Sequence, residues 1–298
     1  MSETRAQNPG LAALFVLLST AFIAASTLTA KALGTGALGP ALHPLQISAG
    51  RFVSALAMFS VAAMVLRPAL KGAPWGLHMG RATAGWAGVT LIFAAVSAIP
   101  MSDATAISFL NPVFAMMLAI PLLGEKVGAV RWSAAGIALL GALVLLRPTP
   151  AAFQPGALLA LGAAMLLGLE LIFIKKLTGR APLMQILWIN NLIGAGLACG
   201  AASLVWQAPT PAQWGGLAAV GLFMGCAQVA FVNGMARGEA SFVAPFSYAT
   251  LVFAGLYDWG VFGVVPDGVS LFGAAVILAG AALLAWREAR RPPGAAGK

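Results

Sequence analysis

Long apolar stretches alternate with short turns rich in glycine and proline along almost the whole chain. A helix that crosses a lipid bilayer needs about 20 consecutive residues that are predominantly apolar. Ten stretches predict such helices, at residues 11–33, 44–66, 77–98, 101–123, 131–146, 156–177, 182–206, 213–235, 240–263 and 269–286. The pattern predicts an all-α membrane protein with ten transmembrane helices, and counts of nine or eleven stay open because boundaries are poorly fixed by sequence.

Composition supports the membrane class. Sixty per cent of the 298 residues are hydrophobic, only 8% are charged, and the mean hydropathy is +0.93. Soluble globular proteins carry about 25% charged residues, so this chain has too few to cover a wetted surface. Five tryptophans lie near predicted helix ends, which is typical of membrane–water interfaces: Trp75, Trp206, Trp214, Trp259 and Trp286.

The second half of the chain repeats the first at a constant offset of 139 residues. The offset holds without a gap from Trp75, which pairs with Trp214, to Leu145, which pairs with Leu284. Other matched pairs are Ser102 and Ser241, Ser108 and Ser247, Phe114 and Phe253, and Gly124 and Gly263. We interpret this as an internal duplication, with helices 1–5 in residues 1–150 and helices 6–10 in residues 151–298.

The first apolar stretch could instead be a cleaved signal peptide, because Ala24-Ala25-Ser26 resembles a cleavage site. The duplication argues against cleavage, since residues 156–177 require a counterpart in the first half. We therefore keep residues 11–33 as the first helix.

Basic residues are distributed unequally between the two sides of the membrane. With the N-terminus inside, only Lys31 and Arg147 face outward, and Arg51 lies within the second helix. Fourteen others face the cytoplasm: Arg5, Arg67, Lys71, Arg81, Lys126, Arg131, Lys175, Lys176, Arg180, Arg237, Arg287, Arg290, Arg291 and Lys298. This asymmetry predicts a multi-pass membrane protein with both termini cytoplasmic, and the family resemblance described below implies the bacterial inner membrane. It also accounts for the net charge of +9 without a nucleic-acid partner.

Five helices per repeat is an odd number, so the second copy must cross the membrane in the opposite direction. Lys126 and Arg131 lie at the inner turn of the first copy, and the offset maps them to Val265 and Ser270. Basic residues are thus absent from the turn that would face outward. Inverted repeats are typical of secondary transporters, whose substrate site lies at the repeat interface near mid-membrane. A duplicated scaffold without transport is the alternative.

Several short motifs resemble one known family. Arg51-Phe52 lies early in the second helix, Asn111-Pro112-Val113-Phe114 breaks the fourth, and Gly124-Glu125-Lys126 follows it. With the two five-helix repeats, these motifs make nearly the whole chain similar to the EamA type of the drug/metabolite transporter superfamily, and most similar to bacterial aromatic amino acid exporters. The second copy departs from the pattern, because Leu251 stands where Pro112 maps.

This resemblance implies a metabolite exporter with a central cavity lined by helices 1, 3, 4, 6, 8 and 9. Aromatic and other neutral amino acids are the first expected substrates, and drugs, nucleobases or other metabolites are alternatives with the same fold. A non-transporting scaffold and a membrane-embedded enzyme are alternatives of another class. The chain has no phosphate-binding loop and no close metal-ligand spacing, so we predict no enzyme activity, cofactor or metal.

Uncharged polar residues on the predicted helices 4, 8 and 9 are candidates for substrate binding. Ser108 and Asn111 lie three apart on one helix face, and Ser247 and Thr250 hold the matching positions in the second copy. Inverted copies would bring these patches together at similar depth, and Gln228 could add a further partner. Hydrogen bonding between helices, worth about 0.6 kcal/mol on average, is the alternative role.

Two aromatic residues, Trp86 and Tyr248, complete the candidate binding set, because a flat apolar substrate suits aromatic walls. Packing and lipid contact are the alternative roles. The motifs Gly76-x3-Gly80 and Gly221-x3-Gly225 permit close helix contact within one subunit or between two, so the oligomeric state stays open.

Ionisable residues inside the membrane are functional candidates, because each costs about 2.5–3.5 kcal/mol to insert at the helix centre. Arg51 could bind a substrate carboxylate, or it could bond helix-end carbonyls or pair with Asp103 or Asp258. Glu170 could couple transport to protons, or it could pair with nearby basic residues. Lys31 is expected to extend to the interface in a structural role, and Asp258 to hold a helix end.

Overall fold

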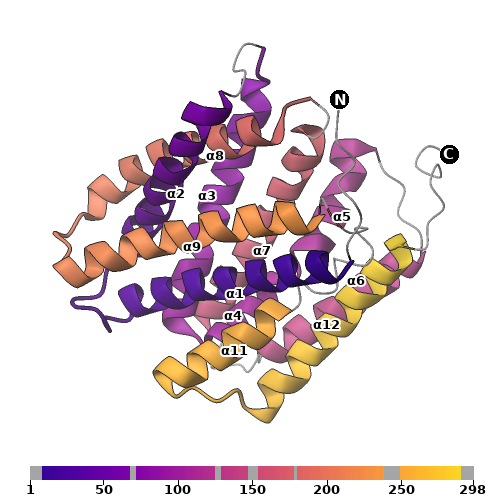
Figure 1. The fold of residues 1–298 in the computed structure, drawn as a ribbon. Helices are drawn as coiled ribbons and strands as arrows, with labels where there is room; N and C mark the ends of the chain where they lie inside the picture. The colour runs from indigo at the N-terminus through magenta and orange to yellow at the C-terminus, as the bar shows by residue number, and fades with distance from the viewer. Residues whose placement is uncertain are drawn as a thin grey trace.

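The computed structural model describes residues 9–67, 72–124, 129–146, 154–177, 180–235, 237 and 249–289, and these residues form helices and turns without a strand. A short 3-10 helix, Ser203–Val205, follows the eighth helix. The α-helices are α1 (Pro9–Gly34), α2 (Pro44–Leu66), α3 (Trp75–Ala98), α4 (Met101–Ser108), α5 (Asn111–Leu123), α6 (Ala129–Leu146), α7 (Pro155–Leu177), α8 (Leu183–Ala202), α9 (Pro211–Met235), α11 (Ala249–Phe262) and α12 (Gly268–Ala289) (Figure 1).

Seven segments of the described chain are long and apolar enough to cross a membrane: Gly10–Gly34, Pro44–Leu66, Trp75–Ala98, Met101–Leu123, Pro155–Leu177, Leu183–Val205 and Pro211–Phe231. Two shorter apolar helices, Ala249–Phe262 and Gly268–Gly280, follow them. The expectation of an all-helical, multi-pass membrane protein is confirmed, and ten crossings remain a prediction. The predicted helix 240–263 is described only from residue 249 onward.

The predicted break in the fourth membrane segment lies between α4 and α5. Helix α4 ends at Ser108, Phe109 and Leu110 form a turn, and α5 begins at Asn111 with Pro112 in its first turn. The N–H groups of a first helical turn have no acceptor within the helix, so a proline there costs no hydrogen bond. The Asn-Pro motif therefore begins a new helix within the membrane segment.

Helices of the two halves pack against one another in antiparallel pairs. Ser19 and Ser26 of α1 donate hydrogen bonds to the carbonyl oxygens of Ala227 (2.8 Å) and Val220 (2.9 Å) of α9. Residue numbers therefore rise along one helix as they fall along the other. Helices α3 and α7 form a second such pair, and α6 packs on α12 (Figure 1). Exchanging the two halves converts the α1–α9 pair into the α7–α3 pair, as a duplication requires.

The second helix of each half also meets its counterpart in an antiparallel pair. Gln46, near the start of α2, donates to the carbonyl oxygen of Gln207, beyond the end of α8 (2.7 Å). Trp188, near the start of α8, donates to Ser60 Oγ near the end of α2 (3.1 Å). Equivalent helices thus point in opposite directions, which is consistent with inverted repeats.

Glycines bring helices of the two halves into close contact. A Cβ added at Gly221 of α9 would lie 2.5 Å from the carbonyl oxygen of Arg51 and 2.9 Å from the backbone nitrogen of Ala55, both in α2. A Cβ at Gly88 of α3 would lie 3.3 Å from the backbone nitrogen of Leu167 in α7. Small residues allow such close backbone approach between membrane helices. These contacts fix the register of the helices that carry the central charges.

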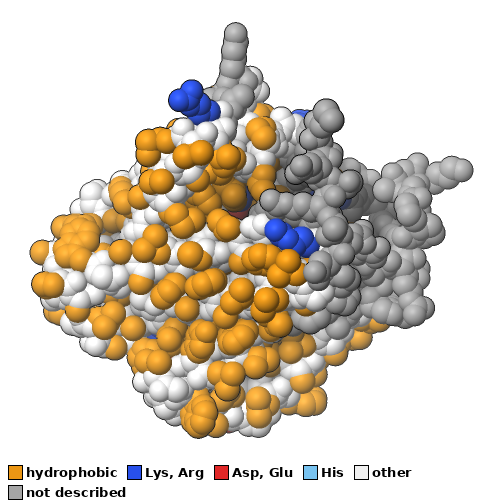
Figure 2. Space-filling model, viewed as in Figure 1, with side chains coloured by type: hydrophobic (Ala, Val, Ile, Leu, Met, Phe, Trp, Pro, Cys, Tyr) orange, Lys and Arg blue, Asp and Glu red, His pale blue; other side chains and the backbone are white. Residues whose placement is uncertain are grey.

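The outer surface of the bundle is apolar. Hydrophobic side chains cover much of the face drawn in Figure 2, with few charged side chains among them. A surface of this kind is matched to hydrocarbon rather than to water. As expected for interfacial residues, four tryptophans near helix ends are exposed: Trp75, Trp206, Trp214 and Trp259. The side chain of Trp286 lies outside the described residues.

The turns after α5 and α11 test the inverted arrangement. Gly124 and Gly263, which the offset of 139 residues pairs, both follow a helix with left-handed backbone, at φ values of +68° and +67°. A cysteine-containing tag inserted after Gly124 should be protected from a membrane-impermeant maleimide in intact cells, and the same tag after Gly263 should be labelled. Equal labelling of both tags would contradict inversion. The control is the untagged chain with Cys199 and Cys226 replaced by serine.

Candidate functional site

Three charged side chains from three helices meet inside the bundle, and we name them the Arg51–Glu170 cluster: Arg51 of α2, Arg81 of α3 and Glu170 of α7. Arg81 Nε lies 3.5 Å from Glu170 Oε1, and Arg81 Nη1 donates to the carbonyl oxygen of Ile186 in α8 (2.9 Å). The Glu170 carboxylate also acts electrostatically on Arg51. The Glu170 side chain keeps 18% of its surface exposed and that of Arg81 only 7%, so a ligand can approach the carboxylate.

The position of Glu170 depends on a glycine in the facing helix. A Cβ at Gly85 of α3 would lie 2.9 Å from the carboxyl carbon of Glu170 and 3.0 Å from each of its carboxylate oxygens. Gly85 lies four residues after Arg81, one helical turn along the same face. The missing side chain therefore makes room for the carboxylate that pairs with Arg81.

Arg51 has the least compensation of the three charges. It lies seven residues into α2, about 10 Å from the start of that helix at 1.5 Å per residue. Its side chain is buried, and within the described chain neither Nε nor Nη1 has a hydrogen-bond partner. Its guanidinium carbon lies 4.2 Å from the centre of the neighbouring Phe52 ring. Two guanidinium groups share one carboxylate, so the cluster carries one excess positive charge.

Other buried polar atoms near these helices lack protein partners in the part of the chain that the structure describes: both ring nitrogens of His78, Trp86 Nε1, Asn190 Oδ1, Asn191 Oδ1 and Gln228 Oε1. Trp86 packs against a buried cluster formed by α2 and α8, which includes Phe52, the residue that follows Arg51. Buried polar groups are normally hydrogen-bonded. A set of donors and acceptors left without partners is a feature of sites that bind a polar ligand.

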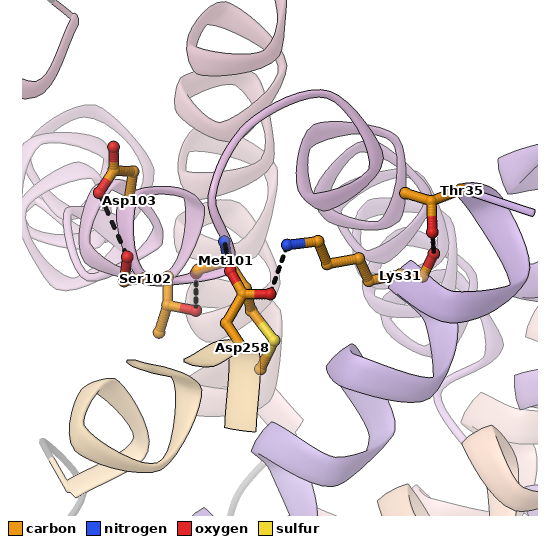
Figure 3. Close-up of polar contacts among 7 residues, drawn as sticks. Lys31, Thr35, Met101, Ser102, Asp103 and Asp258 are labelled. Atoms are coloured by element: carbon orange, nitrogen blue, oxygen red, sulfur yellow. Dashed lines mark hydrogen bonds and ion pairs between the residues drawn. The ribbon is translucent and has the colours of Figure 1, made fainter. Parts of the chain in front are cut away.

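A second set of charges lies where α1, α4 and α11 meet, and we name it the Lys31–Asp258 cluster (Figure 3). Lys31 of α1 forms an ion pair with Asp258 Oδ1 of α11, and both residues are buried. Asp258 Oδ2 accepts a hydrogen bond from the backbone N–H of Met101, the first residue of α4 (2.8 Å). Its carboxylate thus compensates Lys31 and one unpaired N–H of a helix start.

Asp103 extends this cluster to a further helix. Its Oδ2 accepts a hydrogen bond from Ser270 Oγ of α12 (2.9 Å), and its Oδ1 lies 3.3 Å from Ser102 Oγ (Figure 3). Hydrogen bonds and the ion pair therefore join α1 and α4 of the first half to α11 and α12 of the second. Unlike Arg51, Lys31 pairs directly with a carboxylate.

The structure brings some of the candidate residues together. Arg51 and Glu170 interact, Trp86 packs against the cluster that includes Phe52, and Gln228 presents an unpartnered oxygen from α9. Ser108 Oγ donates to the carbonyl oxygen of Thr105 within its own helix (2.7 Å). Asn111 lies close to α7, because a Cβ added at Gly168 would be 2.8 Å from its backbone carbonyl oxygen. Ser247 and Tyr248 lie outside the described residues.

Three expectations about charges are corrected. Arg51 does not pair with Asp103 or Asp258, because Asp258 is occupied by Lys31 and Asp103 by Ser270. Lys31 does not extend to the interface but is 93% buried, since Asp258 offers a counter-charge inside the bundle. Arg81, counted with the cytoplasmic residues, is buried between α7 and α8.

Sequence reasoning missed four residues near the centre: His78, Arg81, Asn190 and Asn191. A signal was present for two of them. His78, Arg81 and Gly85 fall at spacings of three and four on α3, so they share one helix face. A polar stripe that ends in a glycine indicates a face turned toward another helix rather than toward lipid.

Together, the fold and the clusters define a multi-pass helical membrane protein with two packed halves and buried polar groups between them. The chain belongs to the EamA-like transporter family, whose model matches residues 10–147 and again residues 154–286. This membership confirms the predicted superfamily and a role in transport across a membrane. The two matches lie on either side of the boundary that the internal duplication predicts.

Two named transporters and one solved structure are similar to this chain. A riboflavin transporter from Rhizobium johnstonii is 32% identical over 222 residues, covering 73% of this chain and 72% of that protein. An S-adenosylmethionine uptake transporter from Rickettsia bellii is 25% identical over 273 residues, covering 91% and 92%. A solved crystal structure with 24% identity shares the fold, with a TM-score of 0.65 over 96% of this chain and 100% of that chain. These relatives do not support the expected likeness to aromatic amino acid exporters.

The Lys31–Asp258 ion pair should stabilise the fold. Lys31→Met leaves a buried carboxylate without its cation, and breaking a buried pair in this way costs about 3–5 kcal/mol. We expect a clearly lower apparent melting temperature in detergent for Lys31→Met. The double variant with Asp258→Asn should recover part of the loss, because an amide oxygen can still accept from Met101. Unchanged melting of Lys31→Met would contradict this role, and exposed Arg180→Met is the matched control.

Proposed function

We propose that this chain is a secondary transporter that carries a flat heteroaromatic metabolite, with riboflavin as the first candidate. The observation that carries the proposal is the set of buried polar atoms on α2, α3 and α8 that have no hydrogen-bond partner among the described residues, including atoms of Arg51, Trp86, Asn190 and Asn191. A heterocycle with ring carbonyl and N–H groups would supply acceptors to Arg51 and Trp86, and donors to the oxygens of Asn190 and Asn191. Its flat ring would stack on the Trp86 indole.

The names of the relatives support this class of cargo. The relatives are named for riboflavin and S-adenosylmethionine, which both combine a nitrogen heterocycle with a hydroxylated sugar-derived group, an open chain in riboflavin and a ribose ring in S-adenosylmethionine. The aromatic amino acids expected from the resemblance share the flat ring but lack the hydroxylated group. We therefore place riboflavin before tryptophan and phenylalanine as substrate.

Transport requires the site to open to each side of the membrane in turn. Ten helices in two inverted repeats, with both termini cytoplasmic, provide two equivalent bundles that can rock against each other around a central site. In the conformation described, the Lys31–Asp258 cluster holds one end of the bundle together. For the direction we propose uptake rather than export, in line with the name of the Rickettsia relative.

Counterflow in liposomes tests this function. Liposomes containing the full chain and unlabelled riboflavin should accumulate labelled riboflavin above protein-free liposomes, and excess tryptophan should leave the uptake unchanged. Runs with and without a pH gradient measure coupling, and cells that make the protein measure direction. Exchange of labelled tryptophan without flavin exchange would contradict the proposal in favour of amino acid transport. A lack of any solute movement would favour a scaffold.

The contribution of Trp86 can be measured in the same assay. Trp86→Ala should reduce riboflavin exchange roughly tenfold, as expected when a stacking platform for a heterocycle is removed. Trp132→Ala, at an exposed position on α6, is the control and should exchange at the wild-type rate. Equal rates for Trp86→Ala and wild type would remove Trp86 from the site.

A further inference from the structure

Among the described residues, the Arg51–Glu170 cluster carries one positive charge more than its single carboxylate can balance. The charged groups that act on Arg51 there are Glu170, which is opposite in sign, and Arg81, which is like in sign. Glu170 lies against Arg81, so Arg51 shares this carboxylate with a second guanidinium. Arg51 is a buried cation with two of its nitrogen atoms unpartnered in the described chain.

A buried cation without a counter-charge destabilises a fold by several kcal/mol. Packing alone gives no reason for an arginine here, because the neighbouring Phe52, Ala49 and Ala55 are apolar and buried. The Lys31–Asp258 cluster shows how this same chain compensates a structural charge, with a direct carboxylate partner. The different treatment of Arg51 indicates that its partner arrives from outside the protein.

We propose that Arg51 is a specificity-determining residue that selects cargo by charge: it binds acceptor oxygens of neutral or anionic heteroaromatic molecules and rejects cationic ones. This inference rests on the proposed function and names its substrate class more closely. The guanidinium donates to carbonyl or carboxylate oxygens, and these charge-assisted hydrogen bonds form only when the partner is an acceptor. A cationic ligand would add a like charge to a site that already has one in excess.

The proposal separates the two kinds of relative. Riboflavin is uncharged and has ring carbonyl oxygens, so it fits beside Arg51. S-adenosylmethionine carries a positive sulfonium group, whereas S-adenosylhomocysteine lacks only that methyl group and its charge. The two adenosyl compounds are therefore a matched pair that differs mainly in charge, and this site should distinguish them.

Glu170 and Arg81 act as positioning residues in this arrangement. Glu170 forms an ion pair with Arg81 while it also acts electrostatically on Arg51, and Gly85 gives the carboxylate its room. Gly85→Ala would force the carboxylate to move without changing any charge. Gly76→Ala is the matched control on the same helix, because a Cβ at Gly76 meets nothing within 4 Å.

Binding of the matched ligands to the purified full chain tests the inference. We expect wild type to bind S-adenosylhomocysteine at least tenfold more tightly than S-adenosylmethionine, by equilibrium dialysis in detergent. Arg51→Gln should lose this preference and should bind riboflavin roughly tenfold or more weakly, as expected for lost hydrogen bonds to a charged group. Arg51→Lys should keep the charge preference while binding riboflavin more weakly. Gly85→Ala should reduce the preference, and Gly76→Ala should leave it unchanged.

Stability separates this role from a structural one. Because Arg51 is only partly compensated, Arg51→Gln should melt at the same or a higher temperature than wild type, whereas Glu170→Gln should melt lower because it leaves two arginines without a counter-charge. A lower melting temperature for Arg51→Gln with an unchanged preference between the adenosyl compounds would show a structural residue and overturn the inference.

The outcomes distinguish this inference from the proposed function. Riboflavin exchange by wild type, together with equal binding of the two adenosyl compounds, would overturn the charge selection and leave the function standing. A strong preference between the adenosyl compounds without riboflavin exchange would overturn riboflavin as cargo and leave the charge selection standing. Binding of neither adenosyl compound nor riboflavin would overturn both.

Discussion

A charge enclosed by a protein that is itself enclosed by hydrocarbon must find compensation within a few ångströms, and this constraint organises the polar interior of the chain. The Lys31–Asp258 cluster satisfies it completely, with a carboxylate that serves both an ammonium group and the first N–H of a helix. In the Arg51–Glu170 cluster one carboxylate serves two arginines: it pairs with Arg81, and Arg51 keeps two nitrogen atoms without a hydrogen-bond partner in the described chain. The first arrangement holds the helices together. The second leaves an excess positive charge that a bound solute can compensate.

Much of the fold could be predicted because few backbone structures are stable in the hydrocarbon region of a membrane. Backbone groups without water must bond within helices, so the length of each apolar stretch locates a helix, and the Asn111-Pro112 motif locates a break that the structure contains. The duplication was visible in the sequence because identical residues recur at one spacing. The structure is consistent with it, since Gly124 and Gly263 adopt the same backbone conformation. Ten crossings stay a prediction, since seven segments of the described chain are long and apolar enough to span a membrane and two further apolar helices are shorter.

The site was only partly predictable. Arg51 and Glu170 were identifiable because a charge within an apolar stretch is conspicuous, but their relation to each other was not. Glu170 reaches Arg81 because α7 runs antiparallel to α3 and Gly85 leaves space, and the register between segments so far apart is not contained in any local pattern. Arg81 was missed for a related reason. It lies only six residues after the start of its helix, so in the sequence it resembles a charge in a loop, and only the packing of another helix against it shows that it is buried. The role of Ser108 stays a prediction, and its hydroxyl donates to a carbonyl oxygen one turn earlier in its own helix.

The Lys31–Asp258 cluster also gives the two ends of the bundle different energies. The offset of 139 residues maps Asp258 to Ala119 and Ser270 to Arg131, so the first copy has no equivalent carboxylate and hydroxyl with which to build the same junction at the other end. Two halves that began as copies therefore close one end by ionic contacts and the other by different means. In the alternating-access cycle proposed above, the conformation with the ionic end shut would be the more stable one. Opening that end would then require work from the cargo, or from a gradient, in every cycle.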